Sequence, residues 1–231
     1  MPSGIAAIHE RGKIMARSQW GRQYSRNRPQ SKRFLILVEG KVTETQYLLA
    51  VKRLVLRSDE ITIECRNTEP IGMVKRAKDI QRALRKPDKY DAVWCIFDVE
   101  AKRDQQARYG LDEACDEADR TKGSDEIRCA ISNPCFEIWL LWHETDQNAP
   151  IYSTDVQRKC IERNITCGKD GKHLSDAANL VRTGFTDAKT RAEAAFQMHD
   201  RDGKTKPEDR NPSSGVYKLI DAIYTAFPPR I

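Results

Sequence analysis

The sequence predicts an α/β fold, in which a sheet of doubly wound type is flanked by helices and followed by a helical C-terminal portion. Short apolar runs of strand length alternate with amphipathic segments of helical spacing over the first part of the chain. Strands that alternate with helices form βαβ units, because two parallel strands need a long crossover between them. The length of 231 residues suits one large domain with a helical addition better than two independent domains.

The first 32 residues are predicted to form a basic flexible arm. Residues 11–33 hold eight lysine or arginine residues and no acid, interleaved with Trp20 and Tyr24. This composition is typical of a nucleic-acid-binding arm, and an ordinary solvated tail explains it equally well. The folded part is then expected to comprise an α/β core over residues 33–145 and a helical portion over 146–231 that packs on the core.

The first strand is predicted at Phe34–Val38, a continuous apolar run that suits burial on both faces of a parallel sheet. It ends at Glu39-Gly40, and Thr43 is expected to cap a helix that runs to about Arg57. The alternation then continues with a strand at Ile61–Cys65, a basic amphipathic helix at Gly72–Arg85, a buried strand at Ala92–Phe97, a helix over 103–121 and a strand at Ile127–Ile131.

The C-terminal portion is predicted to be mainly helical. After Ser132-Asn133-Pro134 we expect an apolar helix at Cys135–Leu141 with proline at its start, where the missing N–H costs nothing. Later helices are expected at Val156–Asn164, Ser175–Val181, Asp187–His199 and Ser213–Phe227, separated by polar loops at 167–173 and 200–212.

Composition excludes several classes of protein. No apolar run is long enough to span a bilayer, and the N-terminus lacks the apolar core of a secretory signal, so a cytoplasmic location is expected. The seven cysteines form no CxxC pair and are expected to be reduced, and the four scattered histidines offer no zinc-site spacing. A net charge of +6 favours polyanionic partners, although solvated helix faces produce the same sum.

Acidic residues follow three of the predicted strands. Glu39 follows the first, Asp98-Val99-Glu100 follows the third, and Glu137 comes shortly after the fourth. In open α/β sheets functional groups gather at the carboxyl ends of the strands, and the spacing of Asp98 and Glu100 puts both on one side if the chain stays extended. Clustered carboxylates need a cation, and their oxygens select Mg²⁺ or Mn²⁺. Lys41 is then placed to contact a phosphate.

Each acid also has an ordinary structural explanation. A Glu-Gly pair after a strand is commonly a turn, a DxE sequence is common in loops, and Glu137 suits a helix cap. Glu44 is explained as an early-helix acid favoured by the helix dipole, and His143 is better explained as a core or surface residue than as an acid or base.

Two rival functions remain open. A non-catalytic module would bind nucleic acid through the N-terminal arm and through five basic residues, Lys75, Arg76, Lys78, Arg82 and Arg85. A nucleotide-processing or phosphotransfer enzyme would use the same metal, although the chain has no glycine-rich phosphate loop.

Four segments of the sequence resemble the RloB-like proteins of bacterial and archaeal defence loci, which are grouped with the Toprim fold. The matching segments are Leu35–Tyr47, Tyr90–Glu100, Ala130–His143 and Asn211–Ser214. The Ser-Asn-Pro-Cys-Phe-Glu block in the third segment is the most specific. Together the segments extend from about residue 33 to near the C-terminus.

The resemblance implies a Toprim-like, Rossmann-like sheet and a set of catalytic residues. Glu39 takes the place of the glutamate after the first Toprim strand, and Asp98 that of the first aspartate in the DxD pair. Glu100 stands where the second aspartate is usual, and Glu137 matches a third acidic block. Glu39, Asp98 and Glu100 would hold Mg²⁺, with Glu39 or a hydroxide on the metal as base. The implied activity is cleavage of DNA or RNA in anti-phage or restriction-linked loci, often beside an ATPase partner. A further alternative is a partner-dependent effector that stays silent until it assembles with such an ATPase or is triggered by infection.

Overall fold

The computed structural model describes residues 32–66, 68–86, 88–100, 110–121 and 123–230. Residues 1–31 of the predicted basic arm lie outside the described residues, and so does the first part of the helix expected over 103–121. All seven cysteines belong to the described residues and are free thiols. No helix in the described part of the chain is both long and apolar enough to cross a membrane.

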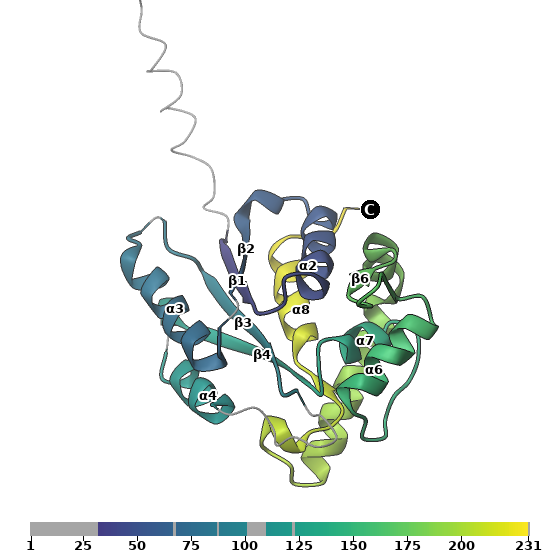
Figure 1. Ribbon diagram of the computed structural model, residues 1–231. Helices are drawn as coiled ribbons and strands as arrows, with labels where there is room; N and C mark the ends of the chain where they lie inside the picture. The colour runs from purple at the N-terminus through teal and green to yellow at the C-terminus, as the bar shows by residue number, and fades with distance from the viewer. Residues whose placement is uncertain (1–31, 67, 87, 101–109, 122, 231) are drawn as a thin grey trace, which may run out of the picture. The chain divides into compact units, whose positions relative to one another are not determined.

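A mostly parallel five-stranded sheet organises the described residues (Figure 1). Its order is β2-β1-β3-β4-β7, and the strands are β1 (Phe34–Val38), β2 (Ile61–Cys65), β3 (Ala92–Asp98), β4 (Ile127–Asn133) and β7 (Ser213–Ser214). The first four run parallel, whereas the short β7 pairs with the end of β4 in the antiparallel sense. The predicted α/β, Rossmann-like class is therefore confirmed. Sequence patterns did not predict β7, because a two-residue strand carries no periodicity.

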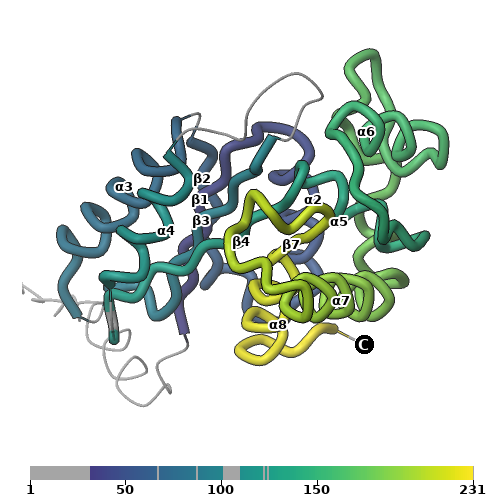
Figure 2. The backbone as a smooth tube through the Cα atoms, turned by 90° about the horizontal axis from the view of Figure 1, so that it is seen from below, coloured from purple at the N-terminus to yellow at the C-terminus, as the bar shows by residue number. Residues whose placement is uncertain are grey.

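Helices cover both faces of this sheet. They are α2 (Thr43–Leu54), α3 (Pro70–Ala83), α4 (Leu111–Asp119), α5 (Glu137–Leu141), α6 (Ser153–Glu162), α7 (Ala177–Arg201) and α8 (Val216–Ala226), with short 3-10 turns at Ser58–Glu60, Gly123–Asp125 and Pro207–Asp209. Figure 2 shows α3 and α4 on one side of the strands, and α2, α5, α7 and α8 on the other.

The two faces of β1 belong to two separate cores. Leu35 and Leu37 pack with residues of α3 and α4, whereas Phe34, Ile36 and Val38 pack in a larger cluster on the opposite face. All five residues are buried, as the continuous apolar run predicted. The larger cluster also takes in side chains from α6, α7 and α8, so the C-terminal helices share one hydrophobic core with the sheet.

The two helices expected at Ser175–Val181 and Asp187–His199 form one continuous helix, α7. Gly184 lies between the two expected ranges. Its missing side chain lets α7 pack closely against His143, because a Cβ at this position would lie 2.7 Å from the Cβ of His143. Tertiary packing of a helix face outweighs the low helix propensity of one glycine.

Several helix starts also differ from the prediction. The last helix was expected from Ser213, but Ser213–Ser214 form β7 and α8 begins at Val216. The apolar helix begins at Glu137 and not at Cys135, and a tight turn leads into it, in which Ile138 N–H donates to the Cys135 carbonyl. Pro134 therefore precedes the helix and does not start it. Thr43 does not cap α2, since it is the first helical residue and its hydroxyl donates to the carbonyl of Lys172.

The expected loop at 167–173 contains most of a small hairpin, formed by β5 (Thr166–Cys167) and β6 (His173–Leu174). Strands of two residues are too short for a pattern to reveal. The hairpin packs against α2, which lies far from it in the sequence.

Candidate metal centre

The candidate site lies where the strand order reverses. The chain passes from β1 to β2 on one side and reaches β3 on the other side of β1, so a crevice opens at the carboxyl ends of β1 and β3. A cleft of about 640 Å³ occupies this position. Six carboxyl groups line it, from Glu39, Glu44, Asp98, Glu100, Glu137 and Asp170. Clefts of this kind are the usual location of ligands in open α/β sheets.

All four acids predicted from the sequence line this one cleft, and so does Lys41. The strand register explains the convergence. Val38, the last residue of β1, pairs with Ile96, so Glu39 continues beside the final residues of β3. By contrast, the basic residues Lys75, Arg76 and Arg82 are exposed on α3 and do not line the cleft.

Asp98 has a strongly perturbed carboxyl group. The residue is half-buried, but its Oδ1 is shielded from solvent and has no hydrogen-bond partner among the described residues. Burial raises the pKa of this carboxyl well above its usual value, and the charges of Glu44 and Glu137 raise it further. The N–H of Phe136 opposes this rise. A buried carboxylate oxygen without a partner is costly unless a proton or a cation compensates it.

Glu44 is a site residue that sequence reasoning missed. It lies in the first turn of α2, and its side chain folds back over Gly40, where an added Cβ would lie 1.8 Å from Glu44 Oε2. Burial raises its pKa to about 7, and the charges of Glu137 and Glu39 also raise it. Hydrogen bonds from the N–H groups of Glu44 and Gly40 act in the opposite direction.

The signal for Glu44 was present in the sequence. The helix that follows a strand begins at the carboxyl end of that strand. An acid in the first turn of the helix therefore lies at the same edge of the sheet as an acid at the end of the strand. The helix-dipole explanation of this position is also satisfied, because Glu44 remains at the N-terminus of α2.

Glu100 reaches the cleft by a different route from the one predicted. The backbone does not stay extended after Asp98, because Glu100 has a φ of 55°, in the left-handed region. Its N–H donates to the Pro134 carbonyl at 2.8 Å, and Val99 N–H donates to the Ser132 carbonyl at 2.9 Å. These two bonds turn the chain along the end of β4. Glu137, at the start of α5, is only 7 % exposed.

The carboxyl groups surround the cleft without forming a closed set of ligands. Among the described residues, no three Asp, Glu, His or Cys side chains lie close enough together to hold a metal ion as they stand. The donor chemistry nevertheless fits a hard divalent cation, because every acidic group offers oxygen and Asp98 has an unpartnered oxygen inside the cluster. Rotation of the longer glutamate side chains would be required to close a ligand set around Asp98.

His143 takes no part in this site. It is buried, and its Nδ1–H donates to the carbonyl of Trp139 at 2.8 Å. This bond assigns the proton to Nδ1, so Nε2 accepts from the hydroxyl of Tyr47 at 3.1 Å. Burial lowers the pKa of His143 to about 4. The residue is therefore a neutral core histidine at physiological pH.

A comparison with protein families identifies the chain. The family model described as RloB-like protein matches residues 34–223. The chain belongs to the RloB-like family. In this RloB-like chain the match begins at the first residue of β1 and ends inside α8, so it includes all six acids of the cleft and the β5–β6 hairpin. No curated protein and no solved structure matched the chain.

Proposed function

We propose that this RloB-like protein is a Mg²⁺-dependent nuclease of the Toprim type, which cleaves phosphodiester bonds of DNA or RNA. The observation that carries the proposal is Asp98. Its Oδ1 is buried without a partner at the end of β3, and the charges around it come from Glu44, Glu137 and Glu39. Carboxyl groups clustered in this way repel one another when they are ionised, and a bound divalent cation would neutralise their charge.

The residues of the cleft take different roles in this proposal. Asp98, Glu39 and Glu100 would bind the cation, and Glu44 is placed to join them. Bound Mg²⁺ would supply charge neutralisation for the phosphodiester and Lewis-acid activation of the attacking water. Glu39 would accept a proton from that water. Glu137, buried at the start of α5, would orient the surrounding loop or support a second ion.

A cleavage assay tests the proposal. Purified protein is incubated with labelled single- and double-stranded DNA, total RNA and tRNA, in Mg²⁺, Mn²⁺ or EDTA. We expect metal-dependent products from the wild type that disappear in Asp98→Asn. Asp116→Asn is the matched control, because Asp116 is exposed on α4 away from the cleft. Equal cleavage by Asp98→Asn, or products that form equally in EDTA, would refute the proposal.

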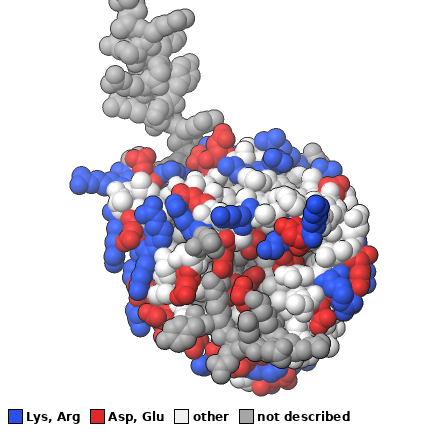
Figure 3. Space-filling model, in the orientation of Figure 1, with Lys and Arg blue, Asp and Glu red and all other residues white. Residues whose placement is uncertain are grey.

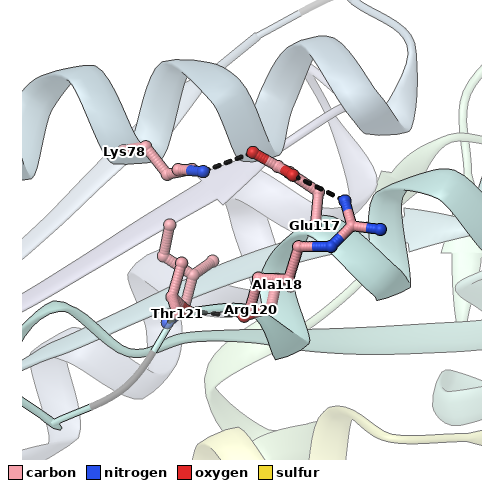
Figure 4. A network of polar contacts seen from close by, with 6 residues as sticks. Lys78, Glu117, Ala118, Arg120 and Thr121 are labelled. Atoms are coloured by element: carbon pink, nitrogen blue, oxygen red, sulfur yellow. Dashed lines mark hydrogen bonds and ion pairs between the residues drawn. The ribbon is translucent and has the colours of Figure 1, made fainter.

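A second candidate is nucleic-acid binding without cleavage, which the exposed cations of α3 favour. Figure 3 shows Lys and Arg side chains gathered on the side of the molecule where α3 lies. Not every cation of this helix is available. Lys78 is bonded to Glu117 of α4, which also accepts from Arg120 at 3.0 Å (Figure 4). Lys75, Arg76 and Arg82 are exposed.

The two candidates differ in their dependence on metal. Binding through α3 would be sensitive to salt but would survive both EDTA and Asp98→Asn.

The family resemblance extends the first proposal to an anti-phage or restriction-linked role in which an ATPase acts with the nuclease. Addition of such a subunit to the cleavage assay would then raise the activity of the wild type and leave Asp98→Asn inactive.

A further inference from the structure

The β5–β6 hairpin brings a residue from the C-terminal part of the chain to the acidic cleft. Its turn spans residues 168–172, and two glycines in the left-handed region, Gly168 and Gly171, allow the tight path. Gly171 is packed against Ile161 of α6, where a Cβ would lie 2.5 Å from the isoleucine Cδ1. Lys172 follows directly and lines the cleft.

Side chains from the first turn of α2 hold this hairpin in place. The Thr43 hydroxyl donates to the carbonyl of Lys172 at 2.9 Å. Gln46 makes two further bonds, since its Oε1 accepts from the N–H of Leu174 at 2.8 Å and its Nε2 lies 2.9 Å from His173 Nδ1. The position of Lys172 is therefore tied to the helix that carries Glu44.

The cleft is mainly acidic, so a lysine side chain that lines it is important for binding an anionic ligand. Six carboxyl groups line the cleft, and only Lys41 and Lys172 among its described lining residues are positively charged. Neither lysine makes an ion pair with another described residue. An anionic ligand would be repelled by the acids, so these two ammonium groups are the cleft's available partners for phosphate oxygens.

We propose that Lys172 binds a backbone phosphate of the nucleic-acid substrate, and that Thr43 is a positioning residue that holds Lys172 at the cleft. This inference rests on the proposed nuclease function and adds a substrate contact from outside the α/β core. Lys41, which comes from the loop before α2, provides the second cation.

Binding is measured by fluorescence anisotropy with labelled 20-nucleotide single-stranded DNA and RNA in Ca²⁺ and in EDTA, over a range of salt. We expect Lys172→Gln to bind the probe about tenfold more weakly, as for the loss of one charge-assisted hydrogen bond. The slope of log K against log salt should fall by about 1. Lys169→Gln is the matched control, because Lys169 is exposed in the same turn but does not line the cleft.

Thr43→Val tests the positioning role. It should weaken binding and lower the salt slope by no more than Lys172→Gln does, because the charge of Lys172 remains but is held less well at the phosphate. In the double variant Thr43→Val/Lys172→Gln, binding should be no weaker than in Lys172→Gln alone, which a general structural defect would not produce. Thermal unfolding of each variant identifies any loss of fold.

The inference is overturned if the wild type does not bind the probe, or if Lys172→Gln binds with the affinity and salt slope of Lys169→Gln. Its failure is distinguishable from failure of the nuclease proposal. Cleavage that is unaffected by Lys172→Gln removes only the lysine contact. Lys172-dependent binding without any metal-dependent cleavage removes only the nuclease.

Discussion

Replacing Glu44 with glutamine should stabilise the metal-free protein at alkaline pH. In the folded protein burial and the charges of Glu137 and Glu39 raise the pKa of Glu44 to about 7, from a usual value of 4.5. A raised folded-state pKa means that the folded protein holds this proton more tightly than the unfolded chain. The associated stability is complete below pH 4.5 and is lost as the pH rises to 7.

The size of the effect follows from the same two values. At about 1.4 kcal/mol for each pKa unit, the rise of the Glu44 pKa corresponds to about 3 kcal/mol of unfolding free energy. Glu44→Gln removes this loss of stability at high pH, because glutamine does not ionise. The amide oxygen of glutamine can still accept a hydrogen bond from the N–H of Gly40. For a chain of this size, about 3 kcal/mol corresponds to a rise of roughly 6–12 °C in the melting temperature.

Thermal and urea unfolding in EDTA at pH 5 and pH 8.5 provide the assay. The gain from Glu44→Gln should be small at pH 5 and near its full size at pH 8.5. Glu113→Gln is the control, because Glu113 occupies the first turn of α4 but is exposed. Parallel stability curves for wild type and Glu44→Gln across this pH range would refute the reasoning, because Glu44 would then titrate equally in both states.

Three further predictions concern the core around His143. The His143 pKa of about 4 predicts that about 3 kcal/mol of stability, present above pH 6.5, is lost as the pH falls towards 4, and that the imidazole NMR signal stays constant from pH 8 to 5.5. Tyr47→Phe leaves buried His143 Nε2 without its donor, so the unfolding free energy measured in urea should fall by about 1–3 kcal/mol. Gly184→Ala forces a Cβ to within 2.7 Å of His143 Cβ, and calorimetry should show a loss of about 1–3 kcal/mol despite the higher helix propensity of alanine.

A different result would contradict each of these three predictions. A His143 titration midpoint near 6.5 would show that the imidazole reaches solvent. An unchanged stability of Tyr47→Phe would remove the assigned hydrogen bond. For Gly184→Ala the control is Thr183→Ala, an exposed neighbour on α7 that should change stability by less than about 0.5 kcal/mol. Equal effects of the two substitutions would contradict the packing argument.

The sequence by itself determined the α/β class and the location of most of the acidic site. Phe34–Val38 and Ala92–Phe97 are apolar runs of strand length, and burial on both sheet faces makes such runs recognisable without any knowledge of distant contacts. Glu39, Asp98 and Glu100 follow these runs directly, so the general rule for carboxyl ends of strands was enough to expect them in one cleft.

The tertiary structure alone decided the features that depend on contacts between distant segments. The hairpin that carries Lys172 is held by Thr43 and Gln46, which lie 127–129 residues away in the sequence. The continuity of α7 through Gly184 depends on the space beside His143. Local patterns report which residues prefer a strand or a helix, whereas these positions are set by packing and hydrogen bonds that exist only once the chain has folded.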